Sequence, residues 1–592
     1  MEMPTHCSRA IILAHQNRPD FHLELRIHPN PPLRTRRVDT RSATNEPQST
    51  TPPTCPKTAT PNCIAAYHSP MSPAATTPNP MTTPAASDAC YLALKARDAR
   101  FDGRFFTGVT STGIYCRPVC RVRTPRRENC LFFALAAQAE LAGFRPCLRC
   151  RPELAPASAA GTSDTLLPWS TQDASLILAQ QAARLLDDPA LWSSSDDGGG
   201  TPSMADVAAR LGVSERHLRR IFEAHWGVSP LQYLQTRRLL MAKRLLTDTQ
   251  LPVAQVAVLS GFASVRRFNA SFVEHYRLQP RQLRASREPV DGQAASEAIV
   301  LKASYRPPYD VAAMLGFFAT RQIEGVEVTD LARLTLARTL ALSVGTRTLQ
   351  GWVRLQFVPD TCNVVLHISP SLGDALPQVL ARLRALLDLD ADPLAINAAL
   401  QNDFPGFDGL RVPGCLDGFE LGVRAILGQQ ITVKAARTLG ARLVERFGTD
   451  LATPVAGLRR LFPTPQALAQ ASGEELGQMG IVRQRQRAIQ ALAQAVLDGG
   501  LHLQPGADIP QTLAALQALP GIGPWTAQYI AMRALRWPDA FVAGDVALHN
   551  ALGVRAAANP QRAAEDASQR WKPWRSYAVV RAWASLATPT GI

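Results

Sequence analysis

Two pairs of closely spaced cysteines are the clearest chemical feature of this chain. Three residues separate Cys116 from Cys120, two separate Cys147 from Cys150, and 26 residues lie between the pairs. Four thiolates at this spacing fit the tetrahedral ligand set of a structural zinc ion. Two alternatives stay open: Cys147 and Cys150 as a redox pair, although no βαβ pattern follows them, or four buried unpaired thiols. We expect one zinc ion here.

A glycine-rich turn followed by an aspartate is the second chemical feature. Within "LQALPGIGPWTAQYIAMRAL" (516–535), the run Pro520 to Gly523 interrupts two expected helices, and Asp545 follows 22 residues after Gly523. Bare glycine backbone lets N–H groups approach a phosphate, and the next helix begins with its positive end. An acid beside a helical cleft can stabilise a developing cation or activate water. The alternatives are a plain connecting loop and an aspartate that only caps a helix.

Composition and charge bound the class of protein that holds these features. The 592 residues are 46% hydrophobic, carry a net charge of +15, and have a pI near 9.7. This length predicts about four domains, and the basic excess predicts a polyanionic partner, most simply nucleic acid. No apolar run reaches the ~20 residues of a membrane span, and no signal peptide is recognisable. We expect a cytoplasmic protein whose cysteines serve metal binding or catalysis in place of disulfides.

Changes of composition divide the chain into five segments. Residues 1–86 are rich in Pro, Thr and Ala and are predicted to be disordered. Flexible breaks are predicted at 188–203 and about 286–297, with a softer break near 402–416. The ordered blocks are then 87–155, 172–287, 300–385 and 386–592. The predicted fold class is multidomain and mainly α, with a small zinc-stapled α/β module and a second α/β domain.

The second ordered block contains two helix-turn-helix patterns. In each, a turn glycine (Gly212, Gly261) precedes a serine (Ser214, Ser264) that is expected to cap a second helix. Residues 201–287 hold 14 basic and 5 acidic residues, which suits a helix in the major groove. The alternative is an ordinary helical bundle with a solvated basic face. The candidate DNA contacts are Arg216, His217, Arg219, Arg220, Arg266 and Arg267.

The first two blocks resemble a known pair of modules. The stretch "FDGRFFTGVTSTGIYCRPVCRVRTPRRENCLFFALAAQAELAGFRPCLRCRPE" is similar to the N-terminal domain of the Ada family of alkylation-response proteins, and the paired motif resembles the AraC-type DNA-binding domain that follows it there. The resemblance implies that Cys116, Cys120, Cys147 and Cys150 bind zinc. It also implies that Cys116 accepts a methyl group from a DNA methylphosphotriester, and that promoter DNA and RNA polymerase are partners. Cys90 and Cys130 are expected to be packing residues.

The C-terminal half resembles the helix-hairpin-helix DNA glycosylase superfamily, in particular the bacterial AlkA type of 3-methyladenine DNA glycosylase. The resemblance covers about 303–585 and includes "SYRPPYDVAAMLGFFATR", "VPGCLDGFELGVRAILGQQITVKAA" and "RWKPWRSYAVVRAWASL". It implies that Asp545 is catalytic and that four aromatic side chains line the base pocket: Phe317, Trp525, Tyr529 and Trp583. It also implies DNA contacts by Gln430, Leu519, Gly521, Gly523 and Thr526, and a monovalent cation at the hairpin.

Departures from these families refine the prediction. Gln430 stands where the wedge residue is often apolar, and Val546 stands where an aromatic residue is expected. Ala527, eighteen residues before Asp545, is the position at which bifunctional relatives carry a lysine, so a monofunctional glycosylase that uses water is expected. The last cysteine is Cys415, which excludes an iron–sulfur cluster after Asp545.

The sequence therefore predicts a monomeric bacterial protein that joins an alkylation sensor, a transcription regulator and a DNA repair glycosylase. The fullest proteins of the Ada family carry a second methyl acceptor in a "PCHR" motif. Neither Cys362 nor Cys415 lies in such a motif, so no second methyl acceptor is expected here. The alternative is a regulator alone with an inactive glycosylase half.

Overall fold

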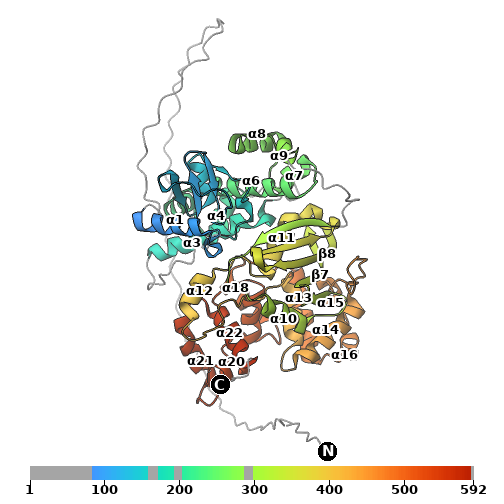
Figure 1. Ribbon diagram of the computed structural model, residues 1–592. Coiled ribbons are helices and arrows are strands. Elements are labelled where there is room, and N and C mark those ends of the chain that lie inside the picture. The colour runs from blue at the N-terminus through green and yellow to red at the C-terminus, as the bar shows by residue number, and fades with distance from the viewer. Residues whose placement is uncertain (1–82, 158–170, 193–202, 286–297, 588–592) are drawn as a thin grey trace, which may run out of the picture. The chain divides into compact units, whose positions relative to one another are not determined.

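The computed structural model describes residues 83–157, 171–192, 203–285 and 298–587 (Figure 1). Helix α1 begins at Pro84, so the predicted disordered segment 1–86 ends slightly too late, and the remainder of it lies outside the described residues. The predicted breaks at 193–202 and 286–297 also lie outside them. Asp188 to Trp192 was predicted to be flexible and is ordered, because Trp192 is buried. Within the described ranges, no helix is long and apolar enough to cross a membrane.

The cysteine block is a small α/β module built on a four-stranded sheet of order β3-β1-β2-β4. Strand β2 runs parallel to β4, with Tyr115 opposite Pro146. Cys116 and Cys147 each follow these partners directly, so the sheet brings the two cysteine pairs together. Cys90 and Cys130 are buried among aromatic side chains, as predicted. The elements are α1 (Pro84–Ala96), β1 (Phe106–Val109), β2 (Ile114–Cys116), β3 (Cys130–Phe133), α2 (Ala136–Leu141) and β4 (Arg145–Pro146).

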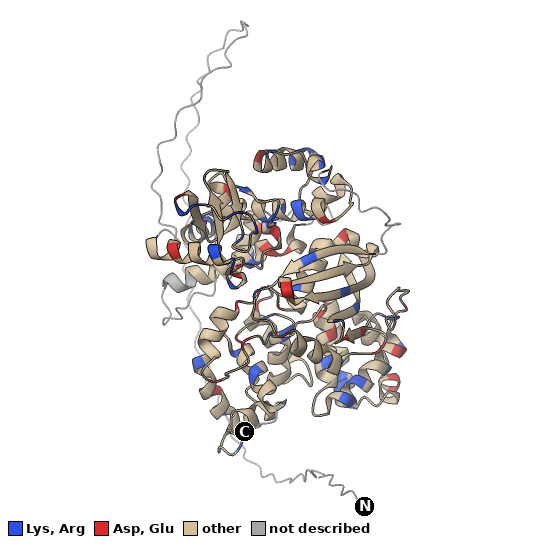
Figure 2. Ribbon diagram, in the orientation of Figure 1, with Lys and Arg blue, Asp and Glu red and all other residues tan. Residues whose placement is uncertain are grey.

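The second block is helical and contains both predicted helix-turn-helix motifs. The hydroxyls of Ser214 and Ser264 accept hydrogen bonds from the backbone N–H groups of His217 and Arg267, which confirms both predicted caps. Lys and Arg outnumber Asp and Glu along these helices (Figure 2). The helices are α3 (Thr171–Asp187), α4 (Met204–Arg210), α5 (Glu215–Trp226), α6 (Pro230–Asp248), α7 (Val253–Leu259), α8 (Val265–Tyr276) and α9 (Pro280–Ala285).

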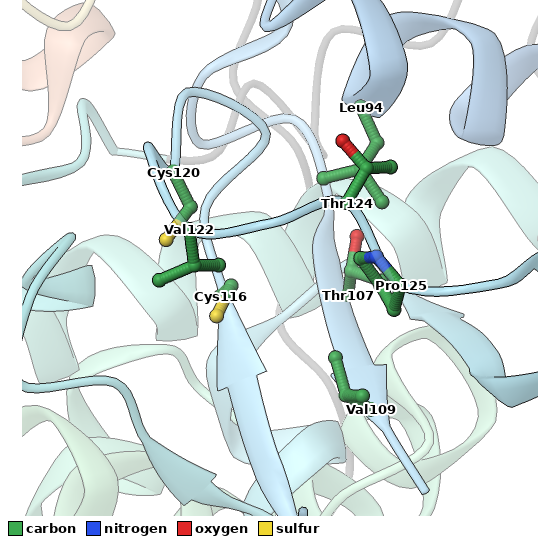
Figure 3. Close-up of a pocket in the computed structure, with 8 residues that line it drawn as sticks. All are labelled: Leu94, Thr107, Val109, Cys116, Cys120, Val122, Thr124 and Pro125. Carbon is green, nitrogen blue, oxygen red and sulfur yellow. The ribbon is translucent and has the colours of Figure 1, made fainter. Parts of the chain in front are cut away.

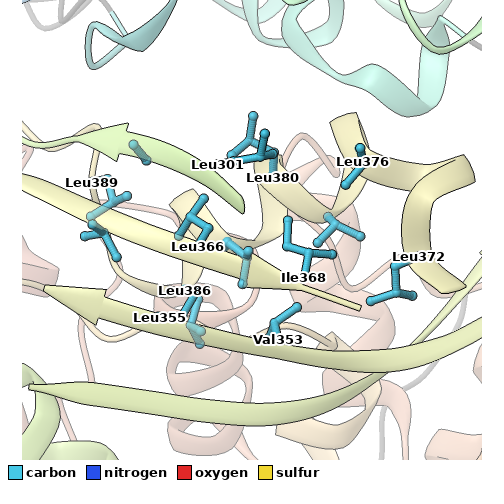
Figure 4. Close-up of a cluster of buried hydrophobic side chains, with 14 of the residues drawn as sticks. Leu301, Val353, Leu355, Leu366, Ile368, Leu372, Leu376, Leu380, Leu386 and Leu389 are labelled. Carbon is cyan, nitrogen blue, oxygen red and sulfur yellow. The ribbon is translucent and has the colours of Figure 1, made fainter. Parts of the chain in front are cut away.

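The third block is an α/β domain whose five-stranded antiparallel sheet has the order β5-β9-β8-β7-β6. One face of the sheet packs on α11 through aliphatic side chains such as Leu355, Leu366 and Leu380 (Figure 4). The alternating "GWVRLQFV" pattern predicted strand β8 (Arg347–Val358), because every second side chain of the pattern enters that core. The elements are β5 (Ile299–Ser304), α10 (Val311–Arg321), β6 (Glu327–Asp330), β7 (Thr335–Val344), β8 (Arg347–Val358), β9 (Asn363–Ile368) and α11 (Leu376–Leu386).

The last block is an all-helical core with two hydrophobic clusters that meet at α19. Ala527 and Ile530 of α19 enter the first cluster, Trp525 packs against the second, and Tyr529 packs against both. The helices are α12 (Pro393–Leu400), α13 (Gly418–Leu427), α14 (Val433–Phe447), α15 (Pro465–Gln470), α16 (Gly473–Gln478), α17 (Arg483–Leu497), α18 (Ile509–Ala518), α19 (Pro524–Arg533), α20 (Val546–Ala551), α21 (Pro560–Ser568) and α22 (Arg575–Ala587). This arrangement confirms the predicted fold class.

Candidate functional site

The four predicted zinc ligands form one cluster in the folded chain. The sulfur atoms of Cys116, Cys120, Cys147 and Cys150 all lie within 4.8 Å of one another. Zinc–sulfur bonds are about 2.3 Å long, so four sulfurs at this mutual distance fit a single tetrahedral zinc ion. The backbone N–H of Arg117 donates to the sulfur of Cys150 at 3.3 Å, a contact that favours the thiolate form. The donor set therefore suits one zinc ion and leaves no protein ligand to spare.

Arg117 lies beside this cluster but is not a surface residue. Its side chain is buried, and its Nε donates to the carboxylate of Asp102 at 2.8 Å. Burial alone would lower the pKa of Arg117, but Asp102 raises it above the usual value, so the guanidinium stays charged. Arg117 is therefore not available to contact a phosphate at the surface, whereas Arg121 and Arg123 are exposed. Asp102 was missed from the sequence, although it is one of few acids in a basic block.

A small cavity adjoins Cys116 and Cys120 (Figure 3). Its volume is about 20 Å³ and most of its lining is apolar, which leaves room for about one water molecule. Thr107 lies opposite Cys116 across the β1–β2 pair. The buried hydroxyl of Thr107 has no hydrogen-bond partner among the described residues. The cavity is too small for a nucleotide, so a ligand of that size could reach the sulfurs only from the surface of the module.

The arginines of the two helix-turn-helix motifs differ in how free they are. Arg219 on α5 forms an ion pair with Glu223 at 2.8 Å, and Arg220 contacts the ring of His217 at 3.0 Å. Across the described parts of the chain, Arg216, Arg266 and Arg267 have no ion-pair partner, and all three are exposed. These three side chains are the better candidates for contact with a polyanion.

The predicted hairpin occupies residues 519–523 between α18 and α19. Gly521 has a φ of +78°, a conformation that favours glycine. Nothing surrounds the position that a Cβ on Gly523 would take, so its backbone is open to a ligand. Thr526, a predicted DNA contact, is buried as a whole residue.

Gln429 links the hairpin to the turn between α13 and α14. Its side-chain amide donates to the carbonyl of Gly521 at 2.9 Å and to the hydroxyl of Thr526 at 3.0 Å. The next residue, Gln430, is exposed and has a φ of +54°. Sequence reasoning identified Gln430 as the wedge and missed Gln429, although both belong to the same "GQQ" signal. The two hydrogen bonds of Gln429 fix the position of the exposed Gln430 relative to the hairpin.

The carboxylate of Asp545 is held by three donors. One oxygen accepts from the backbone N–H of Leu548 at 2.7 Å and from the indole N–H of Trp583 at 3.0 Å. The other oxygen accepts from the indole N–H of Trp525 at 3.0 Å. Asp545 is thus the N-cap of α20 and, at the same time, an oriented carboxylate between two tryptophans. The structure therefore shows the helix cap, and the catalytic role of Asp545 stays a prediction.

Two of the four predicted aromatic residues, Trp525 and Trp583, contact this carboxylate, and arginines accompany the other two. Trp525 stacks on Tyr529 with ring centroids 5.2 Å apart and an interplanar angle of 8°. Phe317 carries two guanidinium groups against its ring, those of Arg321 at 3.9 Å and Arg533 at 4.7 Å from the centroid. The ring of Phe317 therefore already makes cation–π contacts with cations of the protein itself.

Arg533 also sets the electrostatics of Tyr529. Its Nη1 donates to the tyrosine hydroxyl at 2.7 Å. Burial alone would raise the pKa of Tyr529, but the charges of Arg533 and Arg321 outweigh burial and lower it. Each arginine stands four residues after its aromatic partner, a spacing that places both on one helix face. This four-residue spacing is the sequence signal from which both aromatic–arginine pairs could be predicted.

Two departures noted in the sequence have structural outcomes. Ala527 is wholly buried in the first hydrophobic cluster, so counting eighteen residues back from Asp545 does not identify the residue that faces it. Trp525 is the residue of this stretch that meets the carboxylate, and it offers no amine. Val546 is 56% exposed, which leaves one side of the aspartate without an aromatic neighbour.

Comparison with protein-family models gives four matches along the chain. Residues 89–153 match the metal binding domain of Ada, and residues 207–286 match a helix-turn-helix domain. Residues 300–417 match the AlkA N-terminal domain, and residues 423–576 match the HhH-GPD superfamily of base excision DNA repair proteins. Together these matches define a class that joins a sensor-type metal domain, a regulator domain and a DNA glycosylase.

Three curated relatives sharpen this class. A Mycobacterium tuberculosis protein named as a probable bifunctional transcriptional activator/DNA repair enzyme AlkA is 37% identical over 84% of this chain and 96% of its own length. DNA-3-methyladenine glycosylase 2 of Escherichia coli is 38% identical over 47% of this chain and 95% of its own. The Escherichia coli transcriptional activator/DNA repair enzyme Ada is 36% identical over 26% of this chain and 36% of its own. The chain belongs to the family of bifunctional transcriptional activator/DNA repair AlkA proteins.

Proposed function

We propose that the protein senses DNA alkylation through Cys116, regulates transcription through its helix-turn-helix domain, and excises alkylated bases such as 3-methyladenine through Asp545. The observation that carries this proposal is the coexistence, in one chain, of a four-sulfur cluster and a carboxylate oriented by two indoles next to a DNA-type hairpin. In this proposal the sensor is residues 87–155 and the regulator is residues 172–287. The repair enzyme is residues 300–385 together with 386–592.

The sensor step is a methyl transfer in which Cys116 is consumed. Cys116, Cys120, Cys147 and Cys150 would hold a zinc ion, whose charge would keep the thiols deprotonated at neutral pH. The sulfur of Cys116 attacks the methyl carbon of a DNA methylphosphotriester. A sulfur–carbon bond forms, the carbon–oxygen bond breaks, and the phosphodiester leaves as an anion. The methylated phosphate is uncharged, so it can approach an anionic cluster without repulsion.

The repair step is hydrolysis of an N-glycosyl bond. Asp545 stabilises the positive charge that develops on the sugar as the base leaves, and water completes the reaction. Trp525 and Trp583 hold both carboxylate oxygens, which keeps this charge in position before the substrate arrives. Because Trp525 offers no amine, a Schiff-base route is closed and the enzyme is monofunctional. Phe317, Trp525, Tyr529 and Trp583 form the pocket for the extruded base.

The proposal includes the DNA contacts of both halves of the protein. Gln430 enters the duplex beside the lesion, while the hairpin from Leu519 to Gly523, with one monovalent cation, binds backbone phosphate. The helix-turn-helix arginines bind promoter DNA, and RNA polymerase is the partner in activation. The protein acts as a monomer in the bacterial cytoplasm, at the nucleoid, with one zinc ion and no iron–sulfur cluster.

Release of free base from methylated duplex DNA by the purified full-length protein tests the proposal. We expect multiple turnovers that yield 3-methyladenine and an intact abasic strand. Absence of release from a folded protein that still binds abasic DNA would leave a regulator with an inactive glycosylase half. Gln430 and Val546 are the departures that would then explain the loss.

A further inference from the structure

A cavity of about 130 Å³ lies between α6 and the α7–α8 segment of the regulator domain. The side chains of Gln235 and Arg238 enter it from α6, and those of Arg267 and Ser271 enter it from α8. Its volume is well below the ~300 Å³ at which pockets for drug-sized molecules begin. It equals roughly four water molecules, a size that suits a small ion.

The cavity carries two positive charges and no negative charge. Arg238 and Arg267 both line it, and no acidic residue does. In the described part of the chain, neither guanidinium has a hydrogen-bond or ion-pair partner, and the Nε of Arg238 is buried without one. Burial lowers the pKa of Arg238, and the charge of Arg267 lowers it further. A buried donor without an acceptor is costly, and an anion in the cavity would relieve both effects.

The backbone of Gly261 leaves room for Arg238 at the edge of the cavity. Gly261 has a φ of +79°, and a Cβ there would lie 2.7 Å from the Nε of Arg238 and 2.9 Å from the Cβ of Trp192. The glycine therefore admits the guanidinium against the turn that precedes α8, where any larger residue would displace it.

We propose that this cavity binds a phosphate group, with Arg238 and Arg267 as its charged donors and Gln235 and Ser271 as neutral donors. The occupant is a phosphate of the DNA backbone, an assignment that rests on the proposed regulator function. Arg267 then anchors α8 on the backbone, and base reading from this helix falls to Arg266.

The first arm of the test uses inorganic phosphate and the full-length protein without DNA. Isothermal titration should show phosphate binding that Arg238→Gln and Arg267→Gln each weaken about tenfold or more, because each removes a charged hydrogen-bond donor. Arg281→Gln is the matched control, since Arg281 is exposed on α9 and outside the cavity. Arg267 is itself exposed, so its variant keeps the fold even if the Arg238 variant does not.

The second arm uses a duplex of arbitrary sequence at several salt concentrations. Loss of one phosphate contact should reduce the slope of log affinity against log salt by about one. A reduced slope for both cavity variants, but not for Arg281→Gln, supports the DNA phosphate. Phosphate binding that depends on Arg238 with an unchanged slope identifies a free phosphate as the occupant and overturns the DNA assignment. If both variants match the wild type in both arms, the site does not exist.

These outcomes are separable from failure of the proposed function. Both arms use unmethylated protein, so they report on the cavity even if methylation of Cys116 never alters promoter binding.

Discussion

Asp545 combines an observed role in the fold with its proposed role in catalysis. Its carboxylate caps α20 through the N–H of Leu548 and is oriented by Trp525 and Trp583. A cap that is also held by two indoles cannot rotate freely, so its charge faces one direction. Such preorganised charge is the usual source of electrostatic rate enhancement.

Asp545→Asn should reduce base release about 10²–10³-fold. Asparagine still caps a helix, so the thermal unfolding midpoint should stay near that of the wild type. Single-turnover release of 3-methyladenine measures the rate, and binding to abasic-site DNA is the control that should be nearly unchanged. Release at the wild-type rate would exclude Asp545 from catalysis.

Trp525→Phe and Trp583→Phe should each slow base release about tenfold or more, because each removes one indole donor from the carboxylate. Single-turnover kinetics on the same substrate provide the measurement. Trp226→Phe is the control, since the indole of Trp226 donates to a backbone carbonyl in the regulator domain and not to Asp545. Equal rates for all three variants would show that the indoles do not position the aspartate.

At the scale of elements, local signals predicted most of the fold. Ser214 and Ser264 marked helix starts correctly, and alternation along β8 marked a strand with one buried face. Sheet order in the cysteine block was not predictable, because it depends on the parallel pairing of β2 with the two-residue strand β4, which carries no periodic signal.

The features of the two sites also differ in whether a local sequence pattern predicts them. Spacing alone predicted the cysteine cluster, because four ligands of one metal leave a local pattern. The ion pair of Arg117 with Asp102 has no local sequence pattern, because only the folded chain brings these two residues together. Counting from Asp545 selected Ala527, yet the rotation of α19 presents Trp525 to the carboxylate and Ala527 to the core. Contacts between distant segments decide such details.

The hairpin offers a matched pair of glycine substitutions. Gly523→Ala should leave stability unchanged and weaken DNA binding about tenfold, because its Cβ meets open space in the protein but blocks the approach of a phosphate. Gly521→Ala should lower both the stability and the DNA affinity, because φ is +78° and the new Cβ would lie 3.1 Å from the Cβ of Ala488. Thermal unfolding and duplex anisotropy are the two measurements. Unchanged DNA binding for Gly523→Ala would remove the hairpin from the interface.

At the scale of the whole molecule, methylation of Cys116 should raise affinity for promoter DNA. One divalent ion with four thiolates carries a net charge of about −2, which becomes about −1 when one sulfur is a thioether. Repulsion from phosphate then falls beside the exposed Arg121 and Arg123. Mass spectrometry after exposure to methylphosphotriester DNA should find the methyl group on Cys116.

Salt-dependent binding measured before and after exposure completes this test. A methyl group on Cys120, Cys147 or Cys150 would contradict the assignment of the acceptor. Methylation of Cys116 without a gain in affinity would contradict the switch. Cys116→Ser is the matched control and should acquire no methyl group.

Removal of zinc should unfold the cysteine module and spare the glycosylase half. The module is small and its sulfur cluster is one of its few cores, so metal binding supplies much of its folding free energy. A thiol-reactive dye should count six newly accessible cysteines after chelation, the four ligands together with the buried Cys90 and Cys130, while single-turnover base release stays constant. Loss of base release on chelation would show that the two halves fold as one unit.

The proposed methyl acceptor gives the protein a lifetime as well as a function. A sulfur–carbon bond formed at Cys116 has no leaving group that would restore the thiolate, so each chain registers one lesion and then stays in that state. The proposed site at Asp545, in contrast, would regenerate with every base that it releases. Repair would then stop with the last lesion, while the regulatory signal would end only when growth dilutes the methylated chains or proteolysis removes them.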